Sequence, residues 1–411
     1  MSKHAKALIA GTSAATLMFA SAFADDTTEI ENTQVNDNAD VLSLLRLDTG
    51  DAGNATLATA AMGNALEVDV NEAHDVSNDQ TFSGNVRAEA ETSLHHIDGT
   101  AITAASATGN AAYLDFEDDS DIVSTQTAAD GSTVSAAATL NVASYAMSSI
   151  TASQAAANAV EINAETASIQ GDFVQDSGAD VTATTILNAP TGGLGWTAAG
   201  AAAAVGNNIQ TTGFDADQIL DVDQTNRGRI RADMQVEAGG GSEFMTVAAQ
   251  AQGNGVDLNN QWGYAHIQGQ QTNDGEVEAN TNVVISDFDI DSIIVSSEGI
   301  GNSALLSNQG ADTYMGVTQA NNANVRATTR FEGGVGGEVT GSAAAYGNAA
   351  TSYVCSNCPG VEARGNVNQT NSGNVTSTFQ TTYQSGWGVM GSATAVGNSA
   401  TFVSERPGES D

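Results

Sequence analysis

Small residues alternate with variable ones in short stretches that recur along the chain. In the stretch that ends at Asn398, the positions two and four before its glycine are Ala395 and Ala393, and other copies hold Ala, Gly, Ser or Thr there. A period of two is typical of a strand, whereas a helix would spread these positions over a 3.6-residue period. Alanine is a weak strand former, so its repeated use predicts a strand whose inward face has no room for larger side chains.

A second alternating stretch follows a box that reads Gln-Thr-Asn-x-Gly-x-Val-x-Ala in its clearest copies, which begin at Gln224, Gln271 and Gln369. Val or Ile stands six positions after the Gln in six copies, and charged residues such as Arg231 and Glu278 follow it directly. This pattern predicts a half-buried strand that is apolar inside and polar outside.

Both boxes recur eight times, at spacings of 46 to 50 residues. The Asn of the first box, preceded by Gly in seven copies and by Ala157 in one, occurs at Asn64, Asn110, Asn158, Asn207, Asn254, Asn302, Asn348 and Asn398. The Gln of the second box occurs at Gln34, Gln80, Gln126, Gln175, Gln224, Gln271, Gln319 and Gln369. Self-similarity at a fixed period is the signature of a repeat architecture.

Strands and polar turns repeated in this way predict an all-β, elongated β-solenoid (β-helix) of eight repeats of about 48 residues over residues 25–403. We expect each repeat to form two coils of about 24 residues, turned at the two boxes, with the glycine supplying the freedom of a tight corner. Stacked Asn and Gln side chains can form hydrogen-bonded ladders, although two coils per repeat would not guarantee direct Asn–Asn contact. An extended array of β-sandwich or Greek-key units is the alternative.

The two ends of the chain differ from the repeats. Residues 1–24 combine a positive start at Lys3 and Lys6, an apolar run and a small-x-small site at Ala22-Phe23-Ala24, which predicts a secretory signal peptide. No later run is long and apolar enough to predict a transmembrane helix. Residues 404–411 form a polar, acidic tail.

Charge narrows the set of partners. Both lysines lie in the predicted signal peptide, so the remaining chain carries nine arginines against 49 acidic residues. Such a surface repels nucleic acid and anionic lipid. The chain also shows no amphipathic, aromatic-ended strand for outer-membrane insertion, so we expect membrane association only through partners. It could attract cationic polymers, basic proteins or calcium, but charge that keeps an exposed β structure soluble is the simpler interpretation.

No catalytic constellation is visible. The histidines share no repeat position, and the motifs of serine hydrolases, phosphate loops and zinc proteases are missing, so the sequence predicts no enzyme, cofactor or metal site. Pairs of Asp at strand spacing could be calcium ligands or glycosidase carboxylates, although solvated surface charge is the commoner role. These residues are Asp215, Asp217, Asp221, Asp223, Asp287, Asp289 and Asp291.

Two pairs of residues carry other hypotheses. Cys355 and Cys358 lie in the longest connection between boxes, where a small-loop disulfide is expected in a secreted protein and a redox pair is the alternative. Trp196 and Trp387 each stand ten residues before the glycine of a Gly-Asn pair. At equivalent positions they would face the same side, either stacking on sugar rings or filling the coil interior.

The signal peptide and the repeated Gln-Thr-Asn-x-Gly-x-Val-x-Ala and Ala-x-Ala-x-Gly-Asn boxes resemble the HfaD family of holdfast-anchor proteins of stalked alphaproteobacteria, and more distantly curlin-type fibre subunits. The resemblance implies a secreted cell-surface protein, associated with the outer membrane, that anchors an adhesive extracellular polysaccharide. It implies partners among the other holdfast-anchor proteins, including a curli-type secretion lipoprotein and a smaller amyloid-like subunit. A polysaccharide-active β-helix enzyme and a curli-like fibre subunit are the alternatives.

Overall fold

The computed structural model describes residues 29–71, 75–240, 243–287, 292–355 and 361–405, and the described chain is built from strands without a helix. The predicted signal peptide and most of the acidic tail lie outside these residues. The strands are β1 (Glu29–Ala52), β2 (Ala55–Val70), β3 (Asp75–Phe116), β4 (Ser120–Ala128), β5 (Thr133–Glu165), β6 (Ile169–Ser177), β7 (Asp180–Phe214), β8 (Gln218–Asn226), β9 (Ile230–Gly240), β10 (Phe244–Gln261), β11 (Ala265–Asn273), β12 (Val277–Asp287), β13 (Ser292–Gln309), β14 (Thr313–Asn321), β15 (Val325–Cys355), β16 (Ala363–Gly365), β17 (Asn368–Asn371) and β18 (Val375–Glu405).

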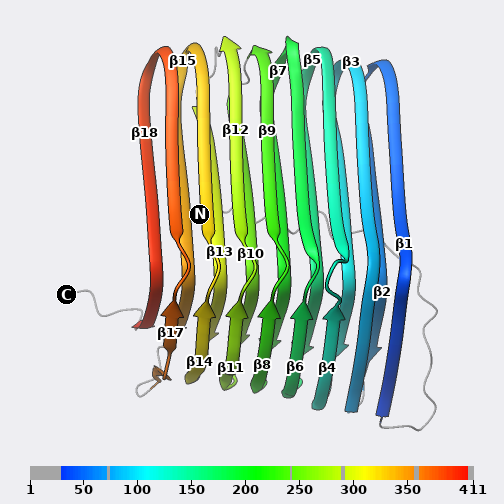
Figure 1. Cartoon of the computed structure of the whole chain (residues 1–411), viewed down its shortest axis with the longest axis vertical. Coiled ribbons are helices and arrows are strands. Elements are labelled where there is room, and N and C mark those ends of the chain that lie inside the picture. Colours follow the sequence, from blue (N-terminus) through cyan, green and yellow to red (C-terminus); the bar gives the residue numbers. More distant parts are fainter. Residues whose placement is uncertain (1–28, 72–74, 241–242, 288–291, 356–360, 406–411) are drawn as a thin grey trace.

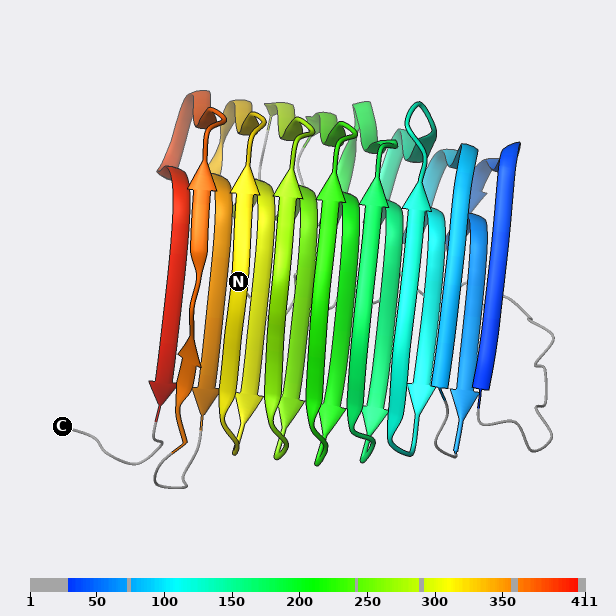
Figure 2. The ribbon, with the colours of Figure 1, turned by 60° about the horizontal axis from the view of Figure 1, so that its bottom comes forward.

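All of these strands belong to one 18-stranded sheet whose inter-strand pairings are parallel. The sheet winds on itself, and successive coils lie side by side in chain order from β1 to β18 (Figure 1 and Figure 2). The prediction of an all-β solenoid is therefore confirmed. Within the described residues, no helix is long and apolar enough to cross a membrane.

Each repeat forms one coil, so the prediction of two coils per repeat is wrong. Gln224 pairs with Gln271, and Asn254 pairs with Asn302, so the strand next to each strand belongs to the adjacent repeat. The repeat closes into one large coil because its strands are long and nearly straight. A wall of about 20 residues extends roughly 65 Å at the rise of a strand.

The coil from β8 to β10 illustrates the path. β8 leads through a short kink at residues 227–229 into β9, which continues in the same direction along one wall (Figure 1). After the bend that follows β9, β10 returns along the opposite wall, and a turn at residues 262–264 leads into β11 of the next coil. The solenoid is thus flattened into two walls whose inner faces touch.

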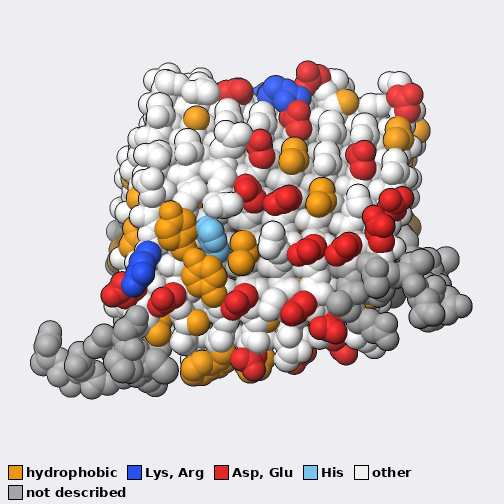
Figure 3. Space-filling view, turned by 90° about the horizontal axis from the view of Figure 1, so that it is seen from below, with side chains coloured by type: hydrophobic (Ala, Val, Ile, Leu, Met, Phe, Trp, Pro, Cys, Tyr) orange, Lys and Arg blue, Asp and Glu red, His pale blue; other side chains and the backbone are white. Residues whose placement is uncertain are grey.

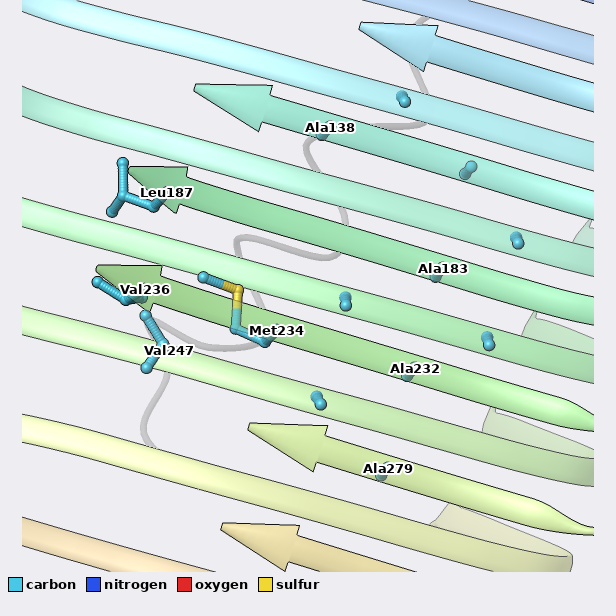
Figure 4. Close-up of a cluster of buried hydrophobic side chains, with 14 of the residues drawn as sticks. Ala138, Ala183, Leu187, Ala232, Met234, Val236, Val247 and Ala279 are labelled. Atoms are coloured by element: carbon cyan, nitrogen blue, oxygen red, sulfur yellow. The ribbon is translucent and has the colours of Figure 1, made fainter. Parts of the chain in front are cut away.

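Small side chains keep the two walls close together. Ala183, Ala232 and Ala279 occupy matching positions of successive coils and are fully buried (Figure 4). Ala204 and Ala251 form a corresponding buried column on the returning wall. The crowded inward face predicted from the alternation of small residues is therefore present on both walls.

The glycine of the Gly-Asn pair lies inside a strand, so the prediction that the two boxes form corners is wrong. An added Cβ on Gly253 would lie 2.5 Å from the carbonyl oxygen of Gly301 in the next coil. The pairing register passes from Gln252 directly to Asn254, so the glycine marks a local irregularity where two backbones approach closely. Ala157 occupies this position in one coil, which shows that a single methyl group can be accommodated.

Candidate functional site

The eight Asn residues form one continuous ladder through the interior. The Nδ2 of Asn64 donates to the Oδ1 of Asn110 at 2.8 Å, and the same bond repeats from coil to coil up to Asn398 at 2.7 to 2.8 Å. The six inner members are fully buried, whereas Asn64 is 7% exposed and Asn398 lies on the exposed last coil. One coil per repeat is what brings these residues into direct contact.

The eight Gln residues form a second ladder with the opposite direction. Each Nε2 donates to the Oε1 of the Gln in the preceding coil, as from Gln271 to Gln224 at 2.7 Å. The remaining six bonds, from Gln80 to Gln369, measure 2.7 to 3.0 Å. Because the amide dipoles of the two ladders point in opposite directions along the solenoid, they offset each other.

The two ladders also join the walls. Asn254 donates its second hydrogen to the carbonyl oxygen of Thr272 at 2.8 Å, and Gln271 donates to that of Ser303 at 2.9 Å. The same pair of wall-to-wall bonds recurs along the solenoid. Buried amides are tolerated when their donors are paired, and here each donor hydrogen has a partner except on Gln34 and Asn398 at the two ends. We call this double ladder the polar waist.

The polar waist divides the core into two apolar columns. The larger column includes Ala232, Val236 and Val247, on the side of the waist toward the bend after β9. The smaller column includes Leu220, Leu258 and Ile267, on the side toward the turn before β11. The solenoid therefore has two hydrophobic cores that are held in register by one hydrogen-bonded seam.

A shorter ladder at the kink was not predicted. Asn226, Asn273 and Asn321 each donate to the Asn of the next coil at 2.7 to 2.8 Å, and Asn371 accepts the last of these bonds. The second hydrogen of Asn273 goes to the carbonyl oxygen of Gly275, which stabilises the kink. The sequence contained a signal for this ladder, since this is the Asn of the Gln-Thr-Asn box. Three of the four earlier copies, however, hold Phe82, Ala128 and Ser177 at this position.

The outer face of the wall built by β4, β6, β8 and β11 is acidic along much of its length. Outward-facing carboxylates line up from coil to coil, as Asp75 does with Asp121 and Asp172 with Asp221. Toward the last coils this face becomes aromatic, where His266 packs edge-on against Tyr264 and Tyr314 at centroid distances of 5.9 and 4.9 Å. Figure 3 shows acidic side chains spread over this view and a hydrophobic group beside a histidine.

Burial determines the protonation state of His266 in this aromatic group. Desolvation lowers the pKa of His266 below its ordinary value, and the nearby Asp221 opposes this only in part. The imidazole is therefore mainly neutral at neutral pH, which suits stacking against the two phenol rings. The neighbouring Arg364 is held by Glu362 at 2.8 Å.

The two tryptophans singled out from the sequence lie at equivalent positions of different coils and are both exposed. Trp196 directly precedes Thr197, which pairs with Phe244. Trp387 lies in β18 and directly precedes Gly388, which pairs with Glu338. Their exposed fractions are 61% and 83%, so they do not fill the coil interior. Trp262, at the opposite bend, is 52% exposed and was not singled out.

Asp215, Asp217 and Asp221 are exposed and Asp223 is half-buried. Asp221 and Asp223 accept hydrogen bonds from Gln268 and Gln270 of the next coil at 3.0 and 2.9 Å, and Asp217 accepts one from the backbone of Tyr264 at 2.7 Å. No group of three or more His, Cys, Asp or Glu side chains that could hold a metal ion occurs among the described residues. Asp289 and Asp291 lie outside them, and calcium binding stays a prediction.

Only one of the two cysteines lies among the described residues. Cys355 is the last residue of β15 and is half-buried, whereas Cys358 lies outside the described residues. The disulfide stays a prediction.

Comparison with protein families identifies a match. A family model described as "Holdfast attachment protein D" matches residues 49–324. No curated protein and no solved structure matches the chain. The matched region begins within β1 and ends at the kink before β15, so it covers most of the coils described above.

Proposed function

The chain belongs to the Holdfast attachment protein D family, and from this premise we propose that it is a secreted surface protein that anchors an adhesive polysaccharide to the outer membrane through partner proteins. The family name supports a role in holdfast attachment and a location at the cell surface or envelope. Secretion, the polysaccharide ligand and the lipoprotein partner are parts of the proposal.

The observation that carries the proposal is the continuous polar waist. Seven Asn bonds and seven Gln bonds tie all eight coils together, and each inner coil is bonded to both of its neighbours. At each junction between coils, a load applied along the stack is shared by one bond of each ladder and by the backbone bonds of the paired strands, which suits a tether. We propose no catalytic role, because Asp217, Asp221 and Asp223 are engaged by neighbouring amides.

Deleting the gene tests the anchor role. We expect mutant cells to make the adhesive polysaccharide but release it into the medium, because the tether is lost while synthesis is intact. Lectin staining of cells and of the culture supernatant would measure this. Deletion cells that keep as much polysaccharide attached as wild-type cells would contradict the proposal.

We further propose that Trp196 and Trp387 contact the polysaccharide. Both present an indole ring to solvent on the same bend of the solenoid, and aromatic rings stack on the apolar faces of sugars. The excess of acidic residues favours a neutral or cationic polymer over an anionic one.

The double variant Trp196→Ala with Trp387→Ala is expected to bind purified polysaccharide at least about tenfold more weakly, if each stacking contact contributes about 1 kcal/mol. Its unfolding temperature should change little, since neither ring is buried. Trp262→Ala is the matched control, because it removes an exposed tryptophan at the opposite bend. Equal losses in the double variant and in the control would argue against a specific contact.

A further inference from the structure

Both ends of the described solenoid are open. Among the described strands, the long first strand β1 pairs with β3 and the last strand β18 pairs with β15, so each leaves one edge without a neighbour. Leu45 stands in the same inward column as Ala90 and Ala138, which are fully buried, yet it is 44% exposed. At the other end, Phe379 stands in the column of the buried Thr329 and is only partly covered.

The polarity of the ladders makes the two ends complementary. At the first coil, Asn64 receives no Asn donor among the described residues, so its Oδ1 is an open acceptor of the ladder. At the last coil, the Nδ2 of Asn398 donates to no other Asn among the described residues, and it lies 3.4 Å from the carbonyl oxygen of Gln369. The Gln ladder shows the reverse, with a spare donor hydrogen on Gln34 and an open acceptor on Gln369.

The wall-to-wall bonds repeat this complementarity. Inside the solenoid, Asn348 donates to the carbonyl oxygen of Thr370, the residue after the Gln of the next coil. The corresponding carbonyl for Asn398 would be that of Val35 in a coil placed beyond the last one. A first coil of a second copy would supply it in the right register.

Side-chain columns also continue across such a junction. Val375 would meet Val41 of the second copy, Phe379 would meet Leu45, and Ser377 would meet Ser43, as their column positions require. On the outer face, Arg364 stands in the column that begins with Glu29, so the junction would pair an arginine with a glutamate.

Charge favours this orientation over a contact between two first coils. β18 contains no charged residue from Val375 to Ser404, so its edge lacks the charges that usually prevent strand addition. β1 carries six acidic residues and one arginine. Joining two first coils would set acidic edges against each other, whereas joining a last coil to a first coil sets an acidic edge against an uncharged one.

We propose that copies of this chain assemble head to tail, with the last coil of one copy stacked in parallel register on the first coil of the next. Three side-chain bonds continue the polar waist across each junction: Asn398 to Asn64, Asn398 to the carbonyl of Val35, and Gln34 to Gln369. Because the contact is heterologous and leaves a free end of each kind, it propagates as a filament. The inference is independent of the proposed anchor function.

Asn398→Asp tests the junction. Aspartate can still accept the bond from Asn348, but it offers no donor and sets a carboxylate oxygen against the Oδ1 of Asn64 in the next copy. Sedimentation velocity over a concentration series should show growing oligomers for the wild-type chain and at least about tenfold weaker self-association for the variant, for a loss of roughly 1.4 kcal/mol or more. The matched control is Thr225→Asp, which adds the same charge to the outer face of a middle coil.

The variant retains a normal first coil, so it should also act as a chain terminator. Added in small amounts to wild-type protein, it is expected to shorten the oligomers, because it can join an open last coil but cannot be extended. A wild-type chain that stays monomeric at all concentrations would overturn the proposal. So would an Asn398→Asp chain that assembles like wild type.

Disulfide cross-linking determines the relative orientation of two copies directly. Thr33 and Asn368 face outward in the same column, so Thr33→Cys on one copy and Asn368→Cys on another should form a disulfide when the two variants are mixed, with Cys355 and Cys358 replaced by Ser. Neither variant should cross-link alone. Efficient cross-linking of Thr33→Cys by itself would indicate a first-coil to first-coil dimer and contradict the head-to-tail arrangement.

Discussion

Replacing Asn254 by leucine is expected to lower the free energy of unfolding by about 3 kcal/mol or more, although the side chains are similar in size. The substitution removes an acceptor for Asn207 and a donor to both Asn302 and the carbonyl of Thr272. Three polar groups then lose a partner, two of them on the fully buried Asn207 and Asn302, at a cost of roughly 1 to 3 kcal/mol for each buried group. Chemical denaturation and hydrogen exchange of the middle coils would measure the effect.

Asn398→Leu is the matched control, measured in dilute protein. It changes the same ladder at its exposed end, where solvent can replace the lost partner of Asn348. A loss much smaller than that of Asn254→Leu is therefore expected. If the two variants lost equal stability, burial of the polar waist would not be what makes its bonds important.

Excising one whole repeat should leave a folded solenoid, whereas excising half a repeat should not. Deleting residues 225–271 joins Gln224 to Thr272, and the register of β8 on β11 shows that the joined strand keeps every column aligned. Gln224 would then lie next to Gln319 in the ladder. Deleting residues 225–248, about half a repeat, removes β9, the strand after the kink. The strands of the two neighbouring coils that pair with β9 then lose their partner.

Circular dichroism, thermal unfolding and protease resistance would separate the two deletions. The whole-repeat deletion is expected to keep a strand-rich spectrum and a cooperative transition, since each coil of a solenoid contacts mainly its neighbours. The half-repeat deletion is expected to be aggregated or protease-sensitive. A stably folded half-repeat deletion would support two coils per repeat and contradict the pairing register.

Much of the interior was predictable because its residues recur. The Asn and Gln positions were identified from their spacing alone, and the crowded inward face followed from alanines such as Ala393 and Ala395 at alternate positions. Polar boxes usually mark turns, and this misled the placement of the corners. The Asn and Gln side chains bond to copies of themselves 46 to 50 residues away, so their partners are not visible in any local stretch of sequence.

The surface features were less predictable. The distance of Trp196 and Trp387 from the Gly-Asn pair predicted that they occupy equivalent positions. It did not predict their exposure, because the same distance fits a ring that points inward or outward. No sequence pattern predicted that Tyr264, His266 and Tyr314 lie together. His266 and Tyr314 share a column only because β11 pairs with β14, and Tyr264 lies in the turn before β11.

By itself, the sequence determined that the chain is an all-β stack of eight like units, with small inward residues and amides that repeat in step. Only the tertiary structure decided that each unit is one coil, that the two ladders run in opposite directions, and that the two ends complement each other. The physical reason is that a strand pattern specifies which side chains point inward, whereas the partners of those side chains depend on how far the strand continues before it bends. That distance is set by the packing of the two walls against each other.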